Sequence, residues 1–328
     1  MTPPAVSVIM NCYNSAAHLR SALQSLLGQT CDDFELIFFD NASTDESPVI
    51  FRESAGIFSG RARYFRGERT VPLGAARNCA LSHIRGGYVA FLDCDDLWLP
   101  EKLERQMSLF EANPKVGLVC TDTEIFDGDR VVRRLFSGIR PARGRVFAEL
   151  VERQWISMSS AMLRREALES LPDEPSGETG GKTRGYFDER LNMCEEADVF
   201  YRIAHDWELD YVDAPLTRWR VHGANTTFRG FGQFADETLY ILEKHRRLYP
   251  EYDTEHADLV DLLTRRAAFQ KGVALWREGR GGQARAEIAP WRHISLKYRL
   301  FWWGSFLPGR CFDCAARIYF SLPAALRR

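Results

Sequence analysis

The sequence predicts an α/β fold, with a mostly parallel sheet flanked by helices and a helical extension at its C-terminal end. The first observation is that short apolar runs alternate with segments whose apolar residues recur at helical spacing. The second is that the first runs end in polar loops, as the buried strands of such sheets do. The third is size, because 328 residues, 45% of them hydrophobic, suffice for one large domain with an appendage or for two domains.

The first part of the chain supplies the alternation. Gly28 lies near the end of the first expected helix, Gly86 and Gly87 close the second, and Pro114 stops the third. The expected order is strand 5–10, helix 15–29, strand 33–40, strand 62–68, helix 72–87, strand 88–93, helix 99–113 and strand 115–126.

The rest of the chain is less regular at first and then helical. Residues 144–171 predict a helix, a strand and a second helix, and residues 194–207 predict a helix with acids in its first turn, followed by a strand. Residues 172–185 are rich in Gly, Pro and charge, which predicts a mobile loop that could act as a lid. The remainder is helical, so the expected domains are residues 1–228 and 229–328.

Three aspartates follow one of the apolar runs directly. If the strand stays extended, Asp93 and Asp95 share a face, where two carboxylates repel each other unless a cation lies between them. The alternative is a polar turn before a helix N-cap, because Asp96 precedes a helical segment with a proline near its start. The polar loops 11–14 and 40–45 also follow strands, and the carboxyl ends of parallel strands meet at one edge. Together the three loops favour a binding site, which can coexist with a cap.

Composition and motifs disfavour several classes of protein. A net charge of −2 gives no global basic field to recruit nucleic acid. No GxGxxG follows the first strand and no GxxxxGK[ST] occurs, which disfavours a nucleotide-dependent dehydrogenase and a P-loop phosphotransferase. The eight cysteines form no metal-type double pair, and the single CxxC of Cys311 and Cys314 is weak evidence for zinc or redox chemistry. Reduced thiols in a cytoplasmic protein are the expectation.

The sequence gives no sign of a signal peptide or of an apolar stretch long enough to span a bilayer. We therefore expect a protein that is soluble or that binds peripherally at the inner face of a membrane.

Five segments of the chain form a recognisable set, in this order: VSVIMNCYN, FFDNASTDESP, LGAARNCALSHIRGGYVAFLDCDDLWLPEKL, EEADVFYRI and WRVHGANTT. Together, at this spacing, they resemble glycosyltransferase family 2, whose members are inverting nucleotide-sugar transferases with the Rossmann-like GT-A fold. The resemblance runs from about Val6 to Asn225 and leaves the helical tail outside. It implies a catalytic domain with a nucleotide-sugar half, about 1–125, and an acceptor half, about 126–228.

The resemblance implies a metal-dependent hexosyltransferase. It would move a sugar from a UDP- or dTDP-sugar to a hydroxyl of a saccharide or lipid-linked saccharide, in the synthesis of bacterial surface polysaccharide or glycoconjugate. The alternative is a catalytically silent protein that binds nucleotide sugars.

The resemblance also assigns residues to the nucleotide. Tyr13, with Asn11 in the same loop, would lie against a pyrimidine base, because an aromatic face stacks well on a flat base. Asp40 would accept a hydrogen bond from the base, as a charged acceptor does strongly, and Asp93 would face the ribose. Arg69 lies where a base- or phosphate-contacting arginine is sometimes found. A turn residue, an Asx turn and a solvated arginine remain the alternatives for Tyr13, Asp40 and Arg69.

The metal would be Mn²⁺ or Mg²⁺, because carboxylate oxygens are hard ligands that suit these ions. By resemblance Asp95 binds the metal, and Asp96 is an alternative ligand or the helix cap. His222 matches a position that approaches the metal or the diphosphate in related enzymes, with an ordinary polar-loop histidine as the alternative.

The proton of the acceptor hydroxyl needs a base, and the resemblance points to Glu196. The family usually has Asp at this position, so Glu196 lengthens the side chain by one methylene. Glu195 would bind an acceptor hydroxyl, or the two roles are exchanged. Acids also favour the first turn of a helix without any catalytic role.

The tail from residue 293 combines aromatic and leucine residues with many arginines. One interpretation is an amphipathic surface that touches an anionic membrane. The other is a helical layer packed on the catalytic domain or on a second subunit. Packing is favoured, because aromatic stripes more often form cores than anchors.

Overall fold

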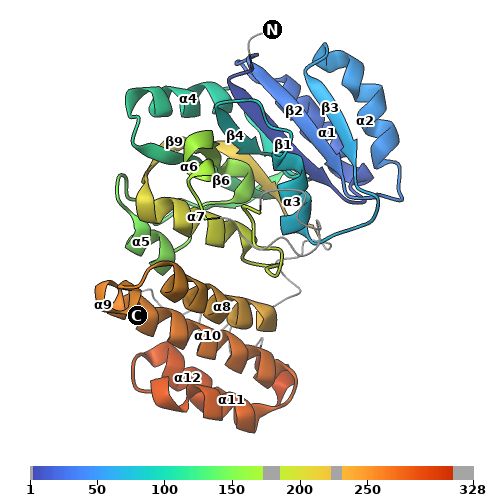
Figure 1. The fold of residues 1–328 in the computed structure, drawn as a ribbon. Coiled ribbons are helices and arrows are strands. Elements are labelled where there is room, and N and C mark those ends of the chain that lie inside the picture. The colour runs from blue at the N-terminus through green and yellow to red at the C-terminus, as the bar shows by residue number, and fades with distance from the viewer. Residues whose placement is uncertain (1–2, 173–184, 223–230, 313–328) are drawn as a thin grey trace. The chain divides into compact units, whose positions relative to one another are not determined.

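Figure 1 shows the fold in a computed structural model of the chain. The chain divides into two compact units, Met1–Gly223 and Ala224–Arg328, and each unit is described by itself. The expected boundary near residue 228 and nearly all of the expected lid loop lie outside the described residues. The described residues are 3–172, 185–222 and 231–312.

The first unit contains the strands and helices that the sequence predicts, with a few short additions. Its strands are β1 Val6–Cys12, β2 Phe34–Asp40, β3 Ala62–Arg66, β4 Tyr88–Phe91, β5 Leu97–Trp98, β6 Val116–Asp127, β7 Arg130–Arg134, β8 Met162–Arg164 and β9 Glu208–Arg220. Its helices are α1 Ala16–Leu27, α2 Ser47–Ala55, α3 Leu73–Leu81, α4 Lys102–Ala112, α5 Phe147–Glu152, α6 Arg165–Glu169 and α7 Glu195–Asp206, with the 3-10 turns η1 Gly56–Phe58 and η2 Met158–Ser160.

The strands of the described part of this unit form one sheet in the order β3-β2-β1-β4-β8-β6-β9-β5, with β7 paired to β6. The first four strands of that order pair in parallel, and so do β6 and β9. The short strand β8 joins the two parallel parts by antiparallel pairing, and the β5 and β7 pairs are antiparallel as well. The α/β class is therefore confirmed, with parallel pairing dominant in the N-terminal half and a mixed second half.

The parallel strands are buried on both faces, which explains their continuous apolar runs. Val8 and Ile9 are neighbours on β1, so they point to opposite faces, and both are at most 1% exposed. Val8 belongs to the main core together with Leu23 of α1 and Leu103 of α4. Helices must therefore cover both sides of the sheet, as the ribbon in Figure 1 shows.

The carboxyl ends of β1, β2 and β4 lie next to one another. Cys12 at the end of β1 pairs in register with Asp40 at the end of β2. On the other side, Ile9 pairs with Phe91, the last residue of β4. The three polar loops that follow these strands therefore share one edge of the sheet, as the alternation predicts.

The helix expected over residues 72–87 is shorter than predicted. It ends at Leu81, because the chain beyond it is held by β1. The backbone amides of Arg85 and Gly86 donate to Ser7 Oγ at 3.1 and 2.9 Å. A Cβ on Gly86 would lie 2.6 Å from the Ser7 nitrogen, so this position accepts only glycine without a backbone shift.

A buried carboxylate anchors the same turn. Glu35 of β2 is 2% exposed and accepts from Ser7 Oγ at 2.8 Å. Its other oxygen lies 2.7 Å from Nη2 of both Arg63 and Arg85. Burial alone would raise the pKa of Glu35, but the hydrogen bonds from Arg85 and Ser7 and the charge of Arg63 lower it overall.

We expect Glu35→Gln to lower the free energy of unfolding of the first unit by about 2 kcal/mol, a value reduced because both arginines are partly exposed. The melting temperature at pH 7 would fall by roughly 4–8 °C. Because the folded pKa lies below the unfolded one, the stabilisation is complete above the ordinary carboxyl pKa and is lost as the pH falls below it. Glu53→Gln, which removes a partner of Arg20 at 57% side-chain exposure, is the control. Equal melting temperatures for the two variants would contradict the anchoring role.

The second unit is helical in its described part, as expected for the tail. A small core holds it together, in which Trp276 and Val273 of α10 (Ala257–Arg277) pack against Phe301 of α12 (Leu296–Gly304). No helix of the described residues, in either unit, is long and apolar enough to cross a membrane. Its helices are α8 Phe231–Leu248, α9 Tyr252–Glu255, α10 Ala257–Arg277, α11 Gly281–Ile288 and α12 Leu296–Gly304.

Candidate active site

The end of β1 and the loop after it present two of the expected nucleotide-binding residues, Asn11 and Tyr13. Tyr13 is 52% exposed, so its ring does not pack on the core and is available to stack on a base. The Nδ2 group of Asn11 is buried and has no hydrogen-bond partner among the described residues. A buried donor without a partner costs free energy, so an acceptor from a ligand or a water molecule fits there. Asn14 ties this loop to its neighbour, because its Oδ1 accepts from the Thr44 amide at 2.8 Å.

Asp40 lies deeper than a base-binding residue is expected to lie. It is 0% exposed, and its Oδ2 accepts hydrogen bonds from Tyr64 Oη and Arg66 Nη1, both at 2.6 Å. Its Oδ1 accepts from the Ser43 amide at 2.8 Å, a local bond that spans three residues where an Asx turn spans two. Asp40 thus shapes the loop after β2, and its contact with a base stays a prediction. Arg69 is exposed on the loop after β3.

The acidic loop turns instead of continuing the strand. β4 ends at Phe91, and the Asp96 amide donates to the Asp93 carbonyl at 3.1 Å, which closes a tight turn. Asp93 and Asp95 therefore do not alternate along an extended strand, and that expectation is wrong. Ser159 of η2 holds the turn, because its Oγ accepts from the Asp93 amide at 3.1 Å and donates to the Asp96 carboxylate at 2.6 Å.

Asp96 is an internal residue of this loop. It is 3% exposed, and the Arg220 amide donates to its second oxygen at 3.0 Å. Burial raises the pKa of Asp96 well above its usual range. The helix-cap interpretation is wrong, because α4 begins at Lys102 and its N-cap residue is Glu101. Metal binding by Asp96 stays a prediction, but both of its oxygens already have protein partners.

Asp95 and His222 come together although 127 positions separate them in the chain. His222 Nε2 lies 2.9 Å from Asp95 Oδ2, and the two side chains are 26% and 30% exposed. Arg220, at the end of β9, brings the strand to this loop because its Nε donates to the Asp95 carbonyl at 2.9 Å. The ring of His18 lies 5.1 Å from that of His222. The two residues expected nearest the metal are thus neighbours.

The acids at the start of α7 converge with the acidic loop on one buried arginine, Arg77 of α3. Its Nη1 lies 2.8 Å from Glu195 Oε1 and 3.7 Å from Glu196 Oε2. Its Nη2 lies 3.8 Å from Asp93 Oδ1. The guanidinium carbon of Arg77 lies over the Phe187 ring, 5.3 Å from the centroid of that ring. Arg77 therefore joins three carboxylates from two distant segments in one cluster.

The two glutamates differ in exposure, which separates their roles. The Glu195 side chain is 3% exposed and bonded to Arg77, whereas 30% of the Glu196 side chain is accessible. Burial of its carboxyl and the negative charge of Glu195 raise the pKa of Glu196 to about 8, against the opposing charge of Arg77. Burial also raises the pKa of Asp93 to about 6, although 41% of its side chain is accessible. Glu196 is thus the accessible one of the two glutamates, and its raised pKa suits a base that acts somewhat above neutral pH.

Sequence reasoning missed Arg77, Ser159 and His18. Arg77 left one signal, since it follows small apolar residues in LGAARNCAL, and a charged side chain buried in such a segment needs ionic partners. Ser159 and His18 left none, because a serine in an irregular segment and a histidine in a helix are ordinary.

The residues present suit a divalent ion of the expected kind. Asp95 offers a carboxylate oxygen and His222 an imidazole nitrogen, a donor pair that suits Mn²⁺ and is acceptable to Mg²⁺. Among the described residues, no three His, Cys, Asp or Glu side chains form a metal cage by themselves. Such ions commonly take one or two protein ligands and complete their shell with substrate phosphates.

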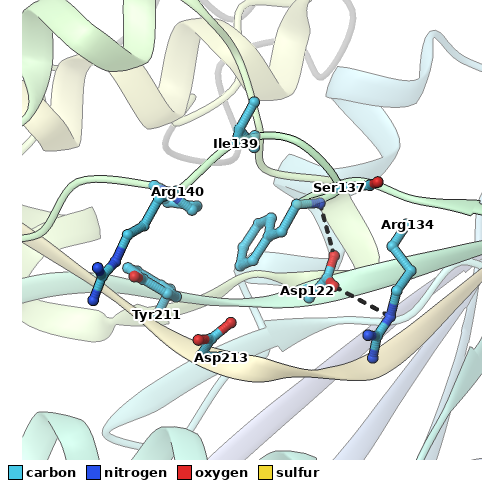
Figure 2. A pocket seen from close by; sticks show the side chains of 9 residues that line it. Asp122, Arg134, Ser137, Ile139, Arg140, Tyr211 and Asp213 are labelled. Atoms are coloured by element: carbon cyan, nitrogen blue, oxygen red, sulfur yellow. Dashed lines mark hydrogen bonds and ion pairs between the residues drawn. The ribbon is translucent and has the colours of Figure 1, made fainter.

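A polar cavity of about 430 Å³ opens beside β6 and β9. Figure 2 shows the Asp122 carboxylate beside the Arg134 guanidinium, whose Nε lies 3.5 Å away. The Phe136 amide donates to the same carboxylate at 3.0 Å. Asp122 is 5% exposed, whereas Arg140 and Asp213 reach solvent at the rim. The volume of the cavity and its mixture of acids and arginines suit a polar small molecule.

A row of side-chain contacts connects this cavity to the acidic loop along one surface of the sheet. Arg134 lies 4.0 Å from Glu124, and Glu124 lies 3.4 Å from Arg218. The guanidinium groups of Arg218 and Arg220 lie 4.4 and 4.6 Å from the centroid of the Phe126 ring. Arg220 in turn bonds the carbonyl of the acidic loop. A ligand that occupies the cavity could therefore extend toward the acidic loop.

An α/β sheet with an exposed aromatic, a carboxylate–imidazole pair and an acidic pair at one edge defines a transferase of the GT-A type that uses nucleotide sugars. The sequence model of glycosyl transferase family 2 matches residues 7–171. The chain belongs to glycosyltransferase family 2, and the resemblance noted in the sequence is confirmed.

Known proteins agree with this assignment. EpsE of Bacillus subtilis, named as a glycosyltransferase, is 29% identical over 252 residues, which are 75% of this chain and 83% of EpsE. The Escherichia coli UDP-Glc:alpha-D-GlcNAc-diphosphoundecaprenol beta-1,3-glucosyltransferase WfgD is 32% identical over 127 residues, 39% of this chain and 49% of WfgD. The mannosyltransferase PcManGT of Pyrobaculum calidifontis, solved with GDP-Man and Mn²⁺, shares the fold with a TM-score of 0.61 at 19% identity, covering 100% of this chain and 83% of PcManGT.

Proposed function

We propose that this glycosyltransferase inverts the anomeric centre as it moves a sugar from a UDP- or dTDP-sugar to an acceptor hydroxyl. The observation that carries the proposal is the convergence on Arg77, which brings the acidic loop and the acids of α7 into one cluster. A donor site and a base on opposite sides of one reacting carbon are what an inverting displacement needs.

Each group has a task in this proposal. Tyr13 and the unpartnered amide of Asn11 hold the nucleoside, and Asp93 faces the ribose. Asp95 and His222 hold Mn²⁺ or Mg²⁺, which supplies positive charge to the diphosphate when bound. Glu196 takes the proton of the acceptor hydroxyl as that oxygen bonds to the anomeric carbon, while the bond from this carbon to the diphosphate oxygen breaks and the nucleoside diphosphate leaves.

Arg77 and Glu195 act on the base. Their 2.8 Å ion pair fixes the guanidinium, which holds the Glu196 carboxylate 3.7 Å away in place. A positioned carboxylate loses little freedom when the reaction begins.

We assign the acceptor to the side of the cavity beside β6. The row of contacts from Asp122 to Arg220 offers donors and acceptors to a polyhydroxylated chain. The name of WfgD describes a sugar linked to a lipid diphosphate as its acceptor, which supports the same acceptor class for this chain. The product would then be a surface polysaccharide or glycoconjugate precursor.

The proposal is tested by a thermal-shift screen of UDP-, dTDP- and GDP-sugars with Mn²⁺, followed by measurement of released nucleoside diphosphate with and without lipid-linked saccharides. We expect one UDP- or dTDP-sugar to raise the melting temperature in the presence of Mn²⁺ and to be consumed when an acceptor is added. Metal-dependent binding without release of diphosphate on any acceptor would favour the silent binder instead.

A further inference from the structure

The second unit exposes an unusual amount of apolar surface over a short stretch. Five of the twelve exposed large hydrophobic residues of the described chain lie between residues 294 and 307. The surface of a soluble protein usually exposes large hydrophobic side chains singly, and a cluster of them marks a contact site. We call these five the aromatic face: Ile294, Leu300, Trp303, Phe306 and Leu307, which are 45%, 43%, 63%, 57% and 53% exposed.

The residues of the aromatic face lie outside the hydrophobic core of the second unit. Leu300 and Trp303 belong to α12, and Phe301 of this helix packs against Trp276 with ring centroids 5.3 Å apart, so α12 already has a buried side. The exposed ring of Trp303 in α12 lies close to that of Phe306, just beyond the helix, with the two ring centroids 6.0 Å apart. The helix thus has an inner side that belongs to the core and an outer side available to a partner.

The segment that carries the aromatic face has charges of one sign. Residues 289–312 contain Arg292, Lys297, Arg299 and Arg310 and no aspartate or glutamate. A cavity of about 330 Å³ lies among Arg292, His293, Arg299, Trp302 and Trp303, so guanidinium groups and indole rings line one hollow. Guanidinium groups bind phosphate oxygens, and indole rings favour the boundary between headgroups and acyl chains.

We propose that the aromatic face docks the protein on a bilayer that contains anionic lipids, with the apolar side chains at the acyl boundary and the arginines on lipid phosphates. A second copy of the chain fits less well, because a symmetric contact would bring these basic groups against their own copies. This inference goes beyond the proposed reaction. Of the two interpretations that the sequence left open for the tail, it takes the membrane surface for the exposed residues, while residues such as Phe301 serve packing.

The test uses the full chain without donor or acceptor, sedimented with vesicles of phosphatidylglycerol and phosphatidylcholine in equal parts or of phosphatidylcholine alone. We expect binding to the anionic vesicles that weakens at least about tenfold in roughly 0.5 M salt. The double variant Trp303→Ser/Phe306→Ser should bind at least about tenfold more weakly. The double variant Arg299→Gln/Arg310→Gln should bind anionic vesicles at least about tenfold more weakly than the wild type. It should bind vesicles of phosphatidylcholine alone as the wild type does.

Ile57→Ser is the matched control, because Ile57 lies in the first unit and is 63% exposed, as Trp303 is. It should bind vesicles as the wild type does. Equal binding by the serine double variant, or equal binding of the wild type to neutral vesicles, would overturn the proposal. A dimer in light scattering that the serine double variant dissociates, with no vesicle binding, would assign the face to self-association. Vesicle binding needs no sugar transfer, so its failure would leave the proposed reaction intact.

Discussion

Asp95→Ala is expected to lower metal-dependent sugar transfer by at least about 10³-fold, because it removes the carboxylate that pairs with His222. Asp95 is 30% exposed, whereas Asp96 is enclosed by Ser159 and Arg220. Of these two aspartates, only Asp95 can therefore reach a metal without rearranging the turn. The measurement is release of nucleoside diphosphate at saturating donor over a series of Mn²⁺ concentrations.

Two further variants separate loss of the metal site from loss of the fold. Asp96→Asn should lower the melting temperature, because Asp96 holds η2 and β9 to the loop. Asp129→Ala, an exposed aspartate between β6 and β7, should change neither property. Asp95→Ala should melt close to the wild type but lose the stabilisation by donor with Mn²⁺. Undiminished metal-dependent turnover in Asp95→Ala would disprove the metal assignment.

The sequence predicted the place of the site better than its internal contacts. Strand and helix periodicity put three polar loops at one edge of a parallel sheet, and the register of β1 with β2 and β4 bears this out. Periodicity reports which face a residue lies on, so it works wherever burial controls the pattern. It could not give the turn at Asp93–Asp96, because Ser159, which fixes that turn, lies 63 positions beyond Asp96.

The partners of Asp40 show the same limit. Tyr64 and Arg66 reach it from β3. The sequence predicts this strand but does not predict that it pairs with β2. The roles of Asp40 as a base ligand and as an Asx turn are indistinguishable until that pairing is known. Convergence on Arg77 is likewise a property of three dimensions, since Glu195 lies 118 positions away.

Glu196→Gln is expected to preserve donor affinity and to lower kcat by about 10²–10⁴-fold, because an amide cannot accept the proton of the acceptor hydroxyl. The substitution keeps the size of the side chain and its position near Arg77. Donor affinity, measured by the Mn²⁺-dependent thermal shift, separates binding from turnover. Equal turnover in the variant would move the base to another group.

The pH dependence of Glu196 variants gives a second, independent signature. Burial and the charge of Glu195 raise the pKa of Glu196 to about 8, so the carboxyl is mostly protonated at neutral pH and becomes a base above it. In the wild type kcat/KM should therefore rise with pH through that region and level off, whereas residual activity of Glu196→Gln should not show this rise.

Glu196→Asp places at this position the aspartate that the family usually has, but its carboxylate is set back by one methylene. It should recover the rise with pH and only part of the rate, since a carboxylate out of reach is a poorer base. A merely structural Glu196 would instead give two variants with the same pH profile as the wild type.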